Sequence, residues 1–184
     1  IFLDSCKDSN FFVSSLLVKP SKKSSPPPFT TSSLQQTASS KLSFSVSKTM
    51  MVAQKLYESG KITYMRTDST NLSDDSVSQI KNYIEKEFGK EYSSPKKYAT
   101  KSKNAQEAHE AIRPTDINQR DLNMGRDEQR LYDIIWNRVV ASQMSDALCE
   151  VTTVTIKNTN TVNSDIYFIS KGEVVKFPGF LKLI

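Results

Sequence analysis

The chain has 184 residues, of which 37% are hydrophobic and 24% are charged, and its 25 basic and 20 acidic side chains leave a net charge of +5. This length suits one domain with a substantial core, or one domain and part of a second. No run approaches the ~18 apolar residues of a membrane helix, which excludes a helical membrane span. The chain begins with Ile1, and the acidic Asp4 follows without a basic flank, so we expect no signal peptide. We also expect the chain to be a piece of a longer protein.

The charge is unevenly distributed along the chain. Residues 1–60 hold 7 basic and 3 acidic side chains (+4), residues 61–150 hold 14 and 15 (−1), and residues 151–184 hold 4 and 2 (+2). Any contact of the middle segment with nucleic acid must therefore depend on individually placed basic side chains. Cys6 and Cys149 share no motif, which is typical of reduced cysteines in a cytoplasmic protein. Two cysteines and a single histidine do not make up a recognisable set of zinc ligands.

Short apolar runs and a proline-rich stretch come first in the chain. Residues 11–13 and 16–18 are rich in β-forming side chains and predict one or two short strands. Residues 19–28 contain four prolines, which remove backbone donors and restrict the residues before them, so a helix is excluded there. We expect a solvated linker or an extended crossing between two bodies.

A pair of helices is predicted next. The first follows Thr31 or Ser32 as its cap and runs to about residue 42, and Ser47 caps the second, which ends at residue 59 before Gly60. Two helices with so short a connection resemble a helix-turn-helix, although most such hairpins bind no DNA. Residues 61–67 then predict a short strand.

Further helices follow the predicted strand. Ser73 caps a helix that ends at Gly89 and buries Val77, Ile80, Ile84 and Phe88. Residues 90–103 form a basic loop, and a short helix over residues 105–112 stops before Pro114. The last helix covers residues 127–144, with a core face of Leu131, Tyr132, Ile135, Trp136 and Val139.

The apolar period changes to two after residue 150. Residues 151–156, 165–170 and 174–177 predict three strands, and a polar turn over residues 158–160 separates the first two. We therefore predict a multi-domain fold, in which β segments over residues 1–28 and 146–184 flank a mainly helical domain over residues 29–145.

Tyr64 and Arg66 are the first candidate site residues. On a strand, alternate side chains share a face, so both would point the same way. A phenol is a poor nucleophile at neutral pH, but a nearby guanidinium favours the phenolate and can hold a phosphate under attack. Thr67, Ser69 and Thr70 add small hydroxyl donors suited to phosphate oxygens. The alternative is an ordinary strand end, in which the tyrosine packs and the arginine pairs with Asp68.

A second polar cluster lies in residues 106–114. Helical spacing would place Gln106, His109, Glu110 and Arg113 on one side, where they could meet a phosphate backbone or form a plain solvated face. The run from His109 to Arg113 is superficially similar to a zinc-protease motif, but Arg113 occupies the place of the second histidine, so we reject that interpretation.

Four segments resemble the type IA DNA topoisomerases, closest to bacterial topoisomerase I, in the family's order and at compatible distances. They read PFTTSSLQQ (28–36), MMVAQKLYE (50–58), ITYMRTDS (62–69) and QEAHEAIRP (106–114). The resemblance is tight over residues 28–144 and looser in the flanking β segments.

This resemblance implies an isomerase that relaxes negatively supercoiled DNA by cutting one strand through a 5′-phosphotyrosine intermediate. It makes Tyr64 the nucleophile, Arg66 the residue that positions the scissile phosphate, and His109 and Arg113 DNA contacts, with Thr67 and Ser69 beside them. It also implies a winged-helix-like, helix-turn-helix core in the helical domain and an incomplete arch domain in the β flanks. The partner would be DNA that is single-stranded at the cleavage site. The resemblance further implies a monomeric enzyme in the bacterial cytoplasm and nucleoid, without a membrane contact.

The chain departs from the family in one respect that bears on activity. The family's Mg²⁺-binding acidic domain has no counterpart here, and no Asp-x-Asp pair occurs, so we expect Mg²⁺ to be held outside this chain and the chain alone to be inactive. Two other classes of function compete with this one. A non-enzymatic winged-helix DNA-binding module would present the helix at residues 47–59 as a positive face, and a structural interaction domain would bury Tyr64.

Overall fold

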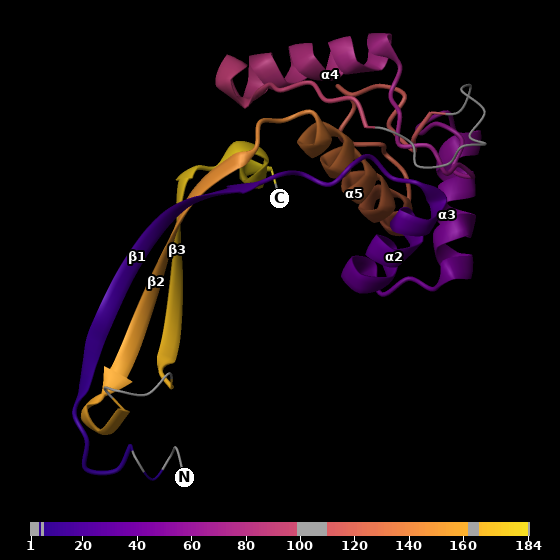
Figure 1. Ribbon diagram of the computed structural model, residues 1–184. Helices are drawn as coiled ribbons and strands as arrows, with labels where there is room; N and C mark the ends of the chain where they lie inside the picture. The colour runs from indigo at the N-terminus through magenta and orange to yellow at the C-terminus, as the bar shows by residue number, and fades with distance from the viewer. Residues whose placement is uncertain (1–3, 5, 99–109, 162–165, 184) are drawn as a thin grey trace. The chain divides into compact units, whose positions relative to one another are not determined.

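The computed structural model describes residue 4 and residues 6–98, 110–161 and 166–183. Within these ranges the chain forms four α-helices and a three-stranded antiparallel sheet (Figure 1). It divides into two compact units. One unit comprises Ile1–Lys23 and Ala147–Pro178, and the other comprises Ser24–Asp146 and Gly179–Ile184.

The first unit is the sheet, with strand order β1-β2-β3. Its strands are β1 (Phe11–Lys23), β2 (Ala147–Asn158) and β3 (Phe168–Phe177). The two short strands predicted near the N-terminus are one long strand, which also includes the first part of the proline-rich stretch. Pro20 is tolerated opposite Glu150 because β1 is an edge strand, where a missing backbone donor disrupts least.

The later strands are also longer than predicted. Residues 151–156 are the middle of β2, and residues 168–177 form one strand in which Gly172 lies opposite Thr152 without a break. A 3-10 turn at Thr159–Thr161 follows β2, where the polar turn was predicted. The start of the predicted strand at residue 165 lies outside the described residues.

The second unit contains the helix pair predicted from the sequence, α2 (Thr31–Leu42) and α3 (Val46–Glu58). The N-cap of α2 is Thr30, not the predicted Thr31 or Ser32, because its hydroxyl accepts from the Ser33 N–H while the Ser33 hydroxyl accepts from the Thr30 N–H. The N-cap of α3 is Ser45, two residues before the predicted Ser47. The chain can cap this early because Ser43 ends α2 in the left-handed region, at φ 58°.

Two further helices complete this unit. Helix α4 (Asp74–Glu87) begins at the predicted cap Ser73, with two acidic residues in its first turn, where they favour the helix dipole. Gly89 follows it at φ 109°. Helix α5 (Arg126–Ser142) starts one residue before and ends two residues before its predicted limits. The core between the helices is apolar and contains Leu34, Val52, Leu56, Ile84, Leu131, Ile135, Trp136 and Val139.

Two predicted elements are wrong where the structure describes them. Residues 61–67 are not a strand, because a single antiparallel bridge, Ile62 to Pro114, is all the β pairing they make among described residues. The predicted helix over residues 105–112 lies mostly outside the described residues, and its last three residues are not helical, with Ile112 bridged to Phe29. In the described part of the chain, no helix has both the length and the apolar character needed to cross a membrane.

Candidate functional site

The segment that carries Tyr64 alternates between buried and exposed side chains. Ile62 and Met65 are each 1% exposed, whereas Tyr64 is 44% exposed and Arg66 is also exposed. The buried pair fixes the segment to the core of the helical unit. No strand forms and the two buried residues are three apart, but Met65 is buried between Tyr64 and Arg66, which leaves both of these side chains at the surface.

The Tyr64 ring contacts one other exposed aromatic side chain. The ring of Tyr57, at the end of α3, lies edge-on to it, with the ring centroids 5.2 Å apart and the planes at 66°. Such a tilted pair restricts the rotation of both rings. Among the described residues, no hydrogen bond is made by the Tyr64 hydroxyl.

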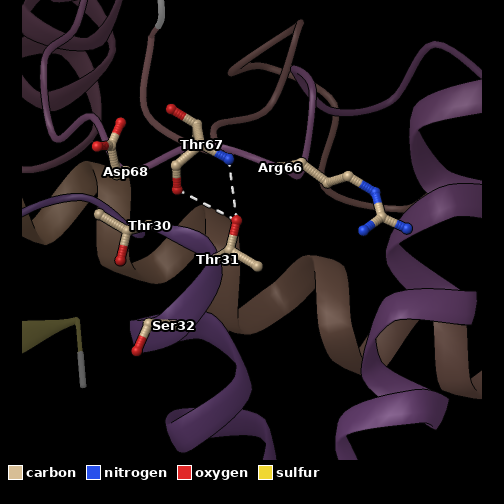
Figure 2. Close-up of a pocket in the computed structure, with 6 residues that line it drawn as sticks. All are labelled: Thr30, Thr31, Ser32, Arg66, Thr67 and Asp68. Carbon is tan, nitrogen blue, oxygen red and sulfur yellow. Dashed lines mark hydrogen bonds between the residues drawn. The ribbon is translucent and has the colours of Figure 1, made fainter. Parts of the chain in front are cut away.

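Arg66 lines an open pocket of about 430 Å³ with the start of α2. The other lining residues are Thr30, Thr31, Ser32, Thr67 and Asp68 (Figure 2). In this view the guanidinium of Arg66 and the carboxylate of Asp68 point to opposite sides of the group. Arg66 makes no ion pair or hydrogen bond with any described residue, so the alternative in which it pairs with Asp68 is not what the structure contains.

Thr67 and Ser69 are occupied by contacts within the protein. Thr31 donates to the Thr67 carbonyl from its backbone N–H at 2.9 Å, and its hydroxyl accepts from the Thr67 N–H at 2.9 Å. The Thr67 hydroxyl accepts from the Ser69 N–H, and the Ser69 hydroxyl accepts from the Asn71 N–H, each at 3.1 Å. Ser69 is only 2% exposed. A DNA contact by Ser69 would therefore require its hydroxyl to leave this turn.

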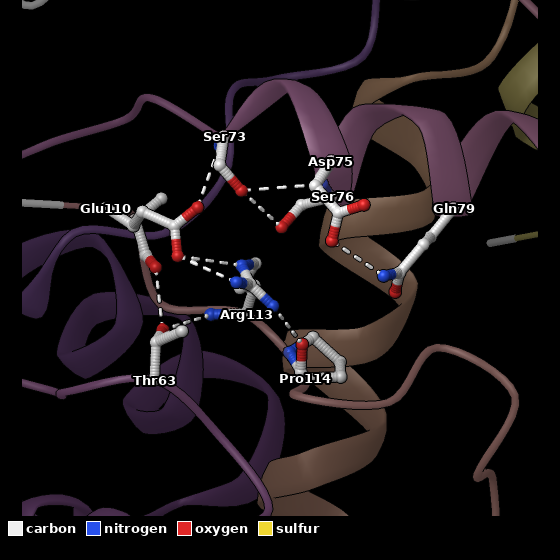
Figure 3. Close-up of polar contacts among 9 residues, drawn as sticks. Thr63, Ser73, Asp75, Ser76, Gln79, Glu110, Arg113 and Pro114 are labelled. Carbon is white, nitrogen blue, oxygen red and sulfur yellow. Dashed lines mark hydrogen bonds and ion pairs between the residues drawn. The ribbon is translucent and has the colours of Figure 1, made fainter.

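Arg113 is also engaged, through an ion pair with Glu110 (Figure 3). Its Nε and Nη2 donate to one oxygen of Glu110 at 3.1 and 2.7 Å, and its Nη1 donates to the Pro114 carbonyl at 3.0 Å. The other Glu110 oxygen accepts from the backbone N–H of Ser73, at 2.7 Å. Burial raises the pKa of the Glu110 carboxyl, but the hydrogen bonds from Ser73 and Arg113 outweigh it and hold that pKa below its ordinary value.

The fold brings the two predicted motifs together. The Thr63 N–H donates to the Arg113 carbonyl at 2.9 Å, and the Arg113 N–H donates to the Thr63 hydroxyl at 3.0 Å. That hydroxyl in turn donates to the Ala111 carbonyl at 2.7 Å. Residues 110–114 therefore lie directly against the residue that precedes Tyr64. Gln106 and His109 lie outside the described residues, so the predicted grouping of His109 with Tyr64 and Arg66 stays a prediction.

Three contributors to this geometry were not singled out from the sequence. Thr63 and Tyr57 are not among the candidate site residues, and the sequence leaves open whether the side of a helix that carries Glu110 meets a phosphate backbone or solvent. A threonine directly before a candidate nucleophile is the one available signal, because its hydroxyl can bond a neighbouring backbone group. The partners of Thr63, Ala111 and Arg113, are 48 and 50 residues distant in the sequence and could not be identified from it.

The basic side chains of α3 are paired within the protein. Lys48 lies 2.7 Å from Asp127, and Lys55 lies 3.2 Å from Glu128, both at the start of α5. The helix therefore does not present the uncompensated positive face expected of a DNA-binding module. In the described ranges, no three His, Cys, Asp or Glu side chains gather closely enough to hold a metal ion. The residues described thus offer no fit for the Mg²⁺ that the family resemblance implies.

A family model for DNA topoisomerases matches residues 1–184. The chain therefore belongs to the DNA topoisomerase family, and the resemblance to the bacterial type IA enzymes is confirmed.

The individual relatives agree with this assignment. DNA topoisomerase 1 of Pasteurella multocida is 46% identical, over 99% of this chain and 21% of the relative. DNA topoisomerase 1 of Escherichia coli is 47% identical, over 90% of this chain and 19% of the relative. The structure of full-length topoisomerase I from Thermotoga maritima matches 99% of this chain and 31% of its own, with 39% identity and a TM-score of 0.80. The chain thus spans about a fifth of the length of these curated relatives.

Proposed function

We propose that this chain carries the nucleophile of a DNA topoisomerase that relaxes negatively supercoiled DNA by transient cleavage of one strand. The observation that carries the proposal is Tyr64, an exposed tyrosine on a segment anchored by two buried side chains. Arg66 is exposed two residues further on, without a described partner to neutralise it. The match of the whole chain to the family supports this assignment.

The proposed reaction is a pair of transesterifications. The Tyr64 oxygen attacks a backbone phosphorus, its proton leaves to solvent, and the bond between phosphorus and the 3′ oxygen breaks. The 3′ oxygen takes up a proton, and the downstream strand stays linked to Tyr64 through its 5′ phosphate. Resealing is the reverse attack by the 3′ hydroxyl, so no energy source is consumed.

The remaining site residues are assigned to the DNA. Arg66 holds the scissile phosphate through its guanidinium, the geometry best suited to phosphate oxygens. His109 and the Thr67 hydroxyl contact the strand beside it. Arg113 is also assigned to the DNA contacts. Its ion pair with Glu110 supports a role in shaping the segment next to His109. Mg²⁺ ligation is assigned to no residue of this chain.

The architecture fits the same proposal. Helices α2 and α3, joined at Ser43–Ser45, would form the helix-turn-helix core of a winged-helix-like domain, and the β1-β2-β3 sheet would belong to an arch. The substrate would be DNA that is single-stranded at the cleavage site, in the bacterial nucleoid, and the enzyme would act as a monomer. A purely DNA-binding module is less well supported, because Lys48 and Lys55 are paired with acidic side chains.

The test uses the complete gene product with a labelled single-stranded oligonucleotide and Mg²⁺. A 5′-phosphotyrosine retains the downstream piece, so label at the 3′ end should become protein-bound, and label at the 5′ end should not. Tyr64→Phe should abolish the adduct and leave DNA affinity within about twofold, because only the nucleophilic oxygen is lost. Tyr167→Phe is the matched control, since Tyr167 is 46% exposed in the sheet unit. An adduct that survives Tyr64→Phe would refute the assignment.

A further inference from the structure

A continuous chain of polar contacts runs from the start of α4 to the residue before Tyr64. It begins at the Ser73 N–H, passes through the carboxylate of Glu110 to the Arg113 guanidinium, and continues from the Arg113 backbone to the Thr63 hydroxyl (Figure 3). The Thr63 hydroxyl uses both of its bonding directions here, accepting from Arg113 N–H and donating to the Ala111 carbonyl. No other described hydroxyl joins the Tyr64 segment to residues 110–114.

The position of Thr63 makes this hydroxyl consequential for Tyr64. The two residues are adjacent, so a displacement of the Thr63 backbone moves the Cα of Tyr64 with it. On the other side of Tyr64 the chain is held by Met65, which is 1% exposed and whose carbonyl accepts from the Thr31 hydroxyl at 2.7 Å. The tyrosine is thus held between two hydroxyl contacts, one on each side in the sequence.

Glu110 is the only carboxylate in this chain of contacts. Its two oxygens have separate partners, the α4 backbone on one side and the Arg113 guanidinium on the other. A neutral amide cannot satisfy both partners, because its NH₂ group would face an N–H or a guanidinium. The carboxylate therefore fixes residues 110–114 against α4, and Thr63 transmits that position to the Tyr64 segment.

We propose that Thr63 and Glu110 are positioning residues for strand cleavage: they set where the Tyr64 oxygen lies relative to the scissile phosphate without touching the DNA themselves. This inference rests on the proposed function, since it concerns the geometry of the same nucleophile. Misplacement of a reacting group by about 1 Å can slow a reaction roughly 100-fold while binding is preserved.

The test compares Thr63→Val, which removes the hydroxyl at nearly constant volume, with Thr63→Ser, which retains it. Each is made in the complete gene product and assayed for single-turnover cleavage of the 3′-labelled oligonucleotide and, separately, for its affinity. Thr63→Val should slow cleavage roughly 10- to 100-fold with affinity within about twofold, and Thr63→Ser should recover most of the rate. Thr152→Val, the same exchange in β2, should cleave as the wild type does.

Two results would overturn the inference: Thr63→Val cleaving at the wild-type rate, or Thr63→Ser failing as badly as Thr63→Val. If Thr63→Val does not fold, Glu110→Gln decides, and wild-type cleavage by that variant would overturn it. When Thr63→Val and Glu110→Gln are combined, their effects on the cleavage rate should be less than multiplicative, because both interrupt one chain of contacts. The wild type and Tyr64→Phe distinguish a failure of this inference from a failure of the proposed function. If the wild type forms no adduct, or if Tyr64→Phe still does, it is the proposed function that fails.

Discussion

At the scale of single residues, the site depends on how each polar side chain is satisfied. Tyr64 and Arg66 are exposed and have no polar partner among the described residues, whereas Ser69 is buried and Arg113 is paired with Glu110. A side chain that already donates to a carboxylate and a carbonyl must lose those contacts before it can bind a phosphate, and that exchange costs about as much as it gains. We therefore expect Arg66 to contribute more to phosphate binding than Arg113.

The charge of Glu110 should make stability depend on pH. Its pKa in the folded protein lies below the ordinary value of 4.5, so the stabilisation is fully present above that value and is lost as the pH falls through the folded pKa. Glu110→Gln should therefore lower the free energy of unfolding by about 1–3 kcal/mol at neutral pH. The difference in free energy of unfolding between Glu110→Gln and the wild type should become smaller in acid. Urea unfolding at about pH 7 and about pH 3.5 measures this, and a gap that stays constant would contradict it.

His109 should make DNA affinity depend on pH near neutrality. Histidine has a reference pKa of ~6.5, and the protonated ring binds a phosphate better than the neutral one. In the complete gene product, affinity for a single-stranded oligonucleotide should rise modestly as the pH falls from about 7.5 to about 6, and His109→Gln should flatten this rise. Fluorescence anisotropy across that range gives the comparison. Identical profiles for the two proteins would remove His109 from the DNA contacts.

At the scale of elements, the helices were predictable because their signals are local. The cap of α4 and the glycine after it act within a few residues and were predicted, and the caps of α2 and α3 lie only one and two residues before the predicted ones. The short elements near Tyr64 were not predictable, because they depend on single bridges between distant residues, Ile62 with Pro114 and Phe29 with Ile112. The candidate site residues follow from the resemblance of short motifs to a family and stay a prediction, whereas the contacts of Thr63 and Glu110 could not be predicted from the sequence.

The position of the α3 cap can be tested directly. Ser45 accepts from the Lys48 N–H at 3.1 Å, whereas Ser47, the cap predicted from the sequence, lies inside the helix and is exposed. Ser45→Ala should destabilise the protein by about 0.5–2 kcal/mol. Ser47→Ala should change stability by less than about 0.5 kcal/mol, since alanine is the better helix former. Thermal melts of the two variants discriminate, and a larger loss in Ser47→Ala would show that the helix begins later.

At the scale of the whole molecule, charge is unevenly distributed along the sequence. The middle of the sequence, residues 61–150, is net −1, although it contains every proposed DNA contact. Affinity for DNA depends mainly on the number of phosphates that basic side chains neutralise. The acidic residues of this segment offset its basic ones, and Arg113 within it, like Lys48 and Lys55 on α3, is already paired with an acidic residue. The chain by itself should therefore bind DNA weakly.

Weak binding and an incomplete set of catalytic groups lead to the last prediction, which concerns the 184-residue chain alone. Cleavage needs the phenol deprotonated, the phosphate held and the leaving 3′ oxygen stabilised. Arg66 can hold the phosphate, but no described residue is placed to protonate the leaving oxygen, and no described cluster can hold a metal ion beside it. Correct placement of both partners also supplies a large part of the rate enhancement, and weak binding forgoes it.

The isolated chain, mixed with a 3′-labelled single-stranded oligonucleotide and Mg²⁺, should form no covalent adduct, whereas the complete gene product should form one under the same conditions. Gel electrophoresis in denaturant compares the two, with the Tyr64→Phe chain as the background. A labelled band from the isolated wild-type chain that Tyr64→Phe removes would show that these residues suffice for cleavage, against the expectation from their charge and chemistry.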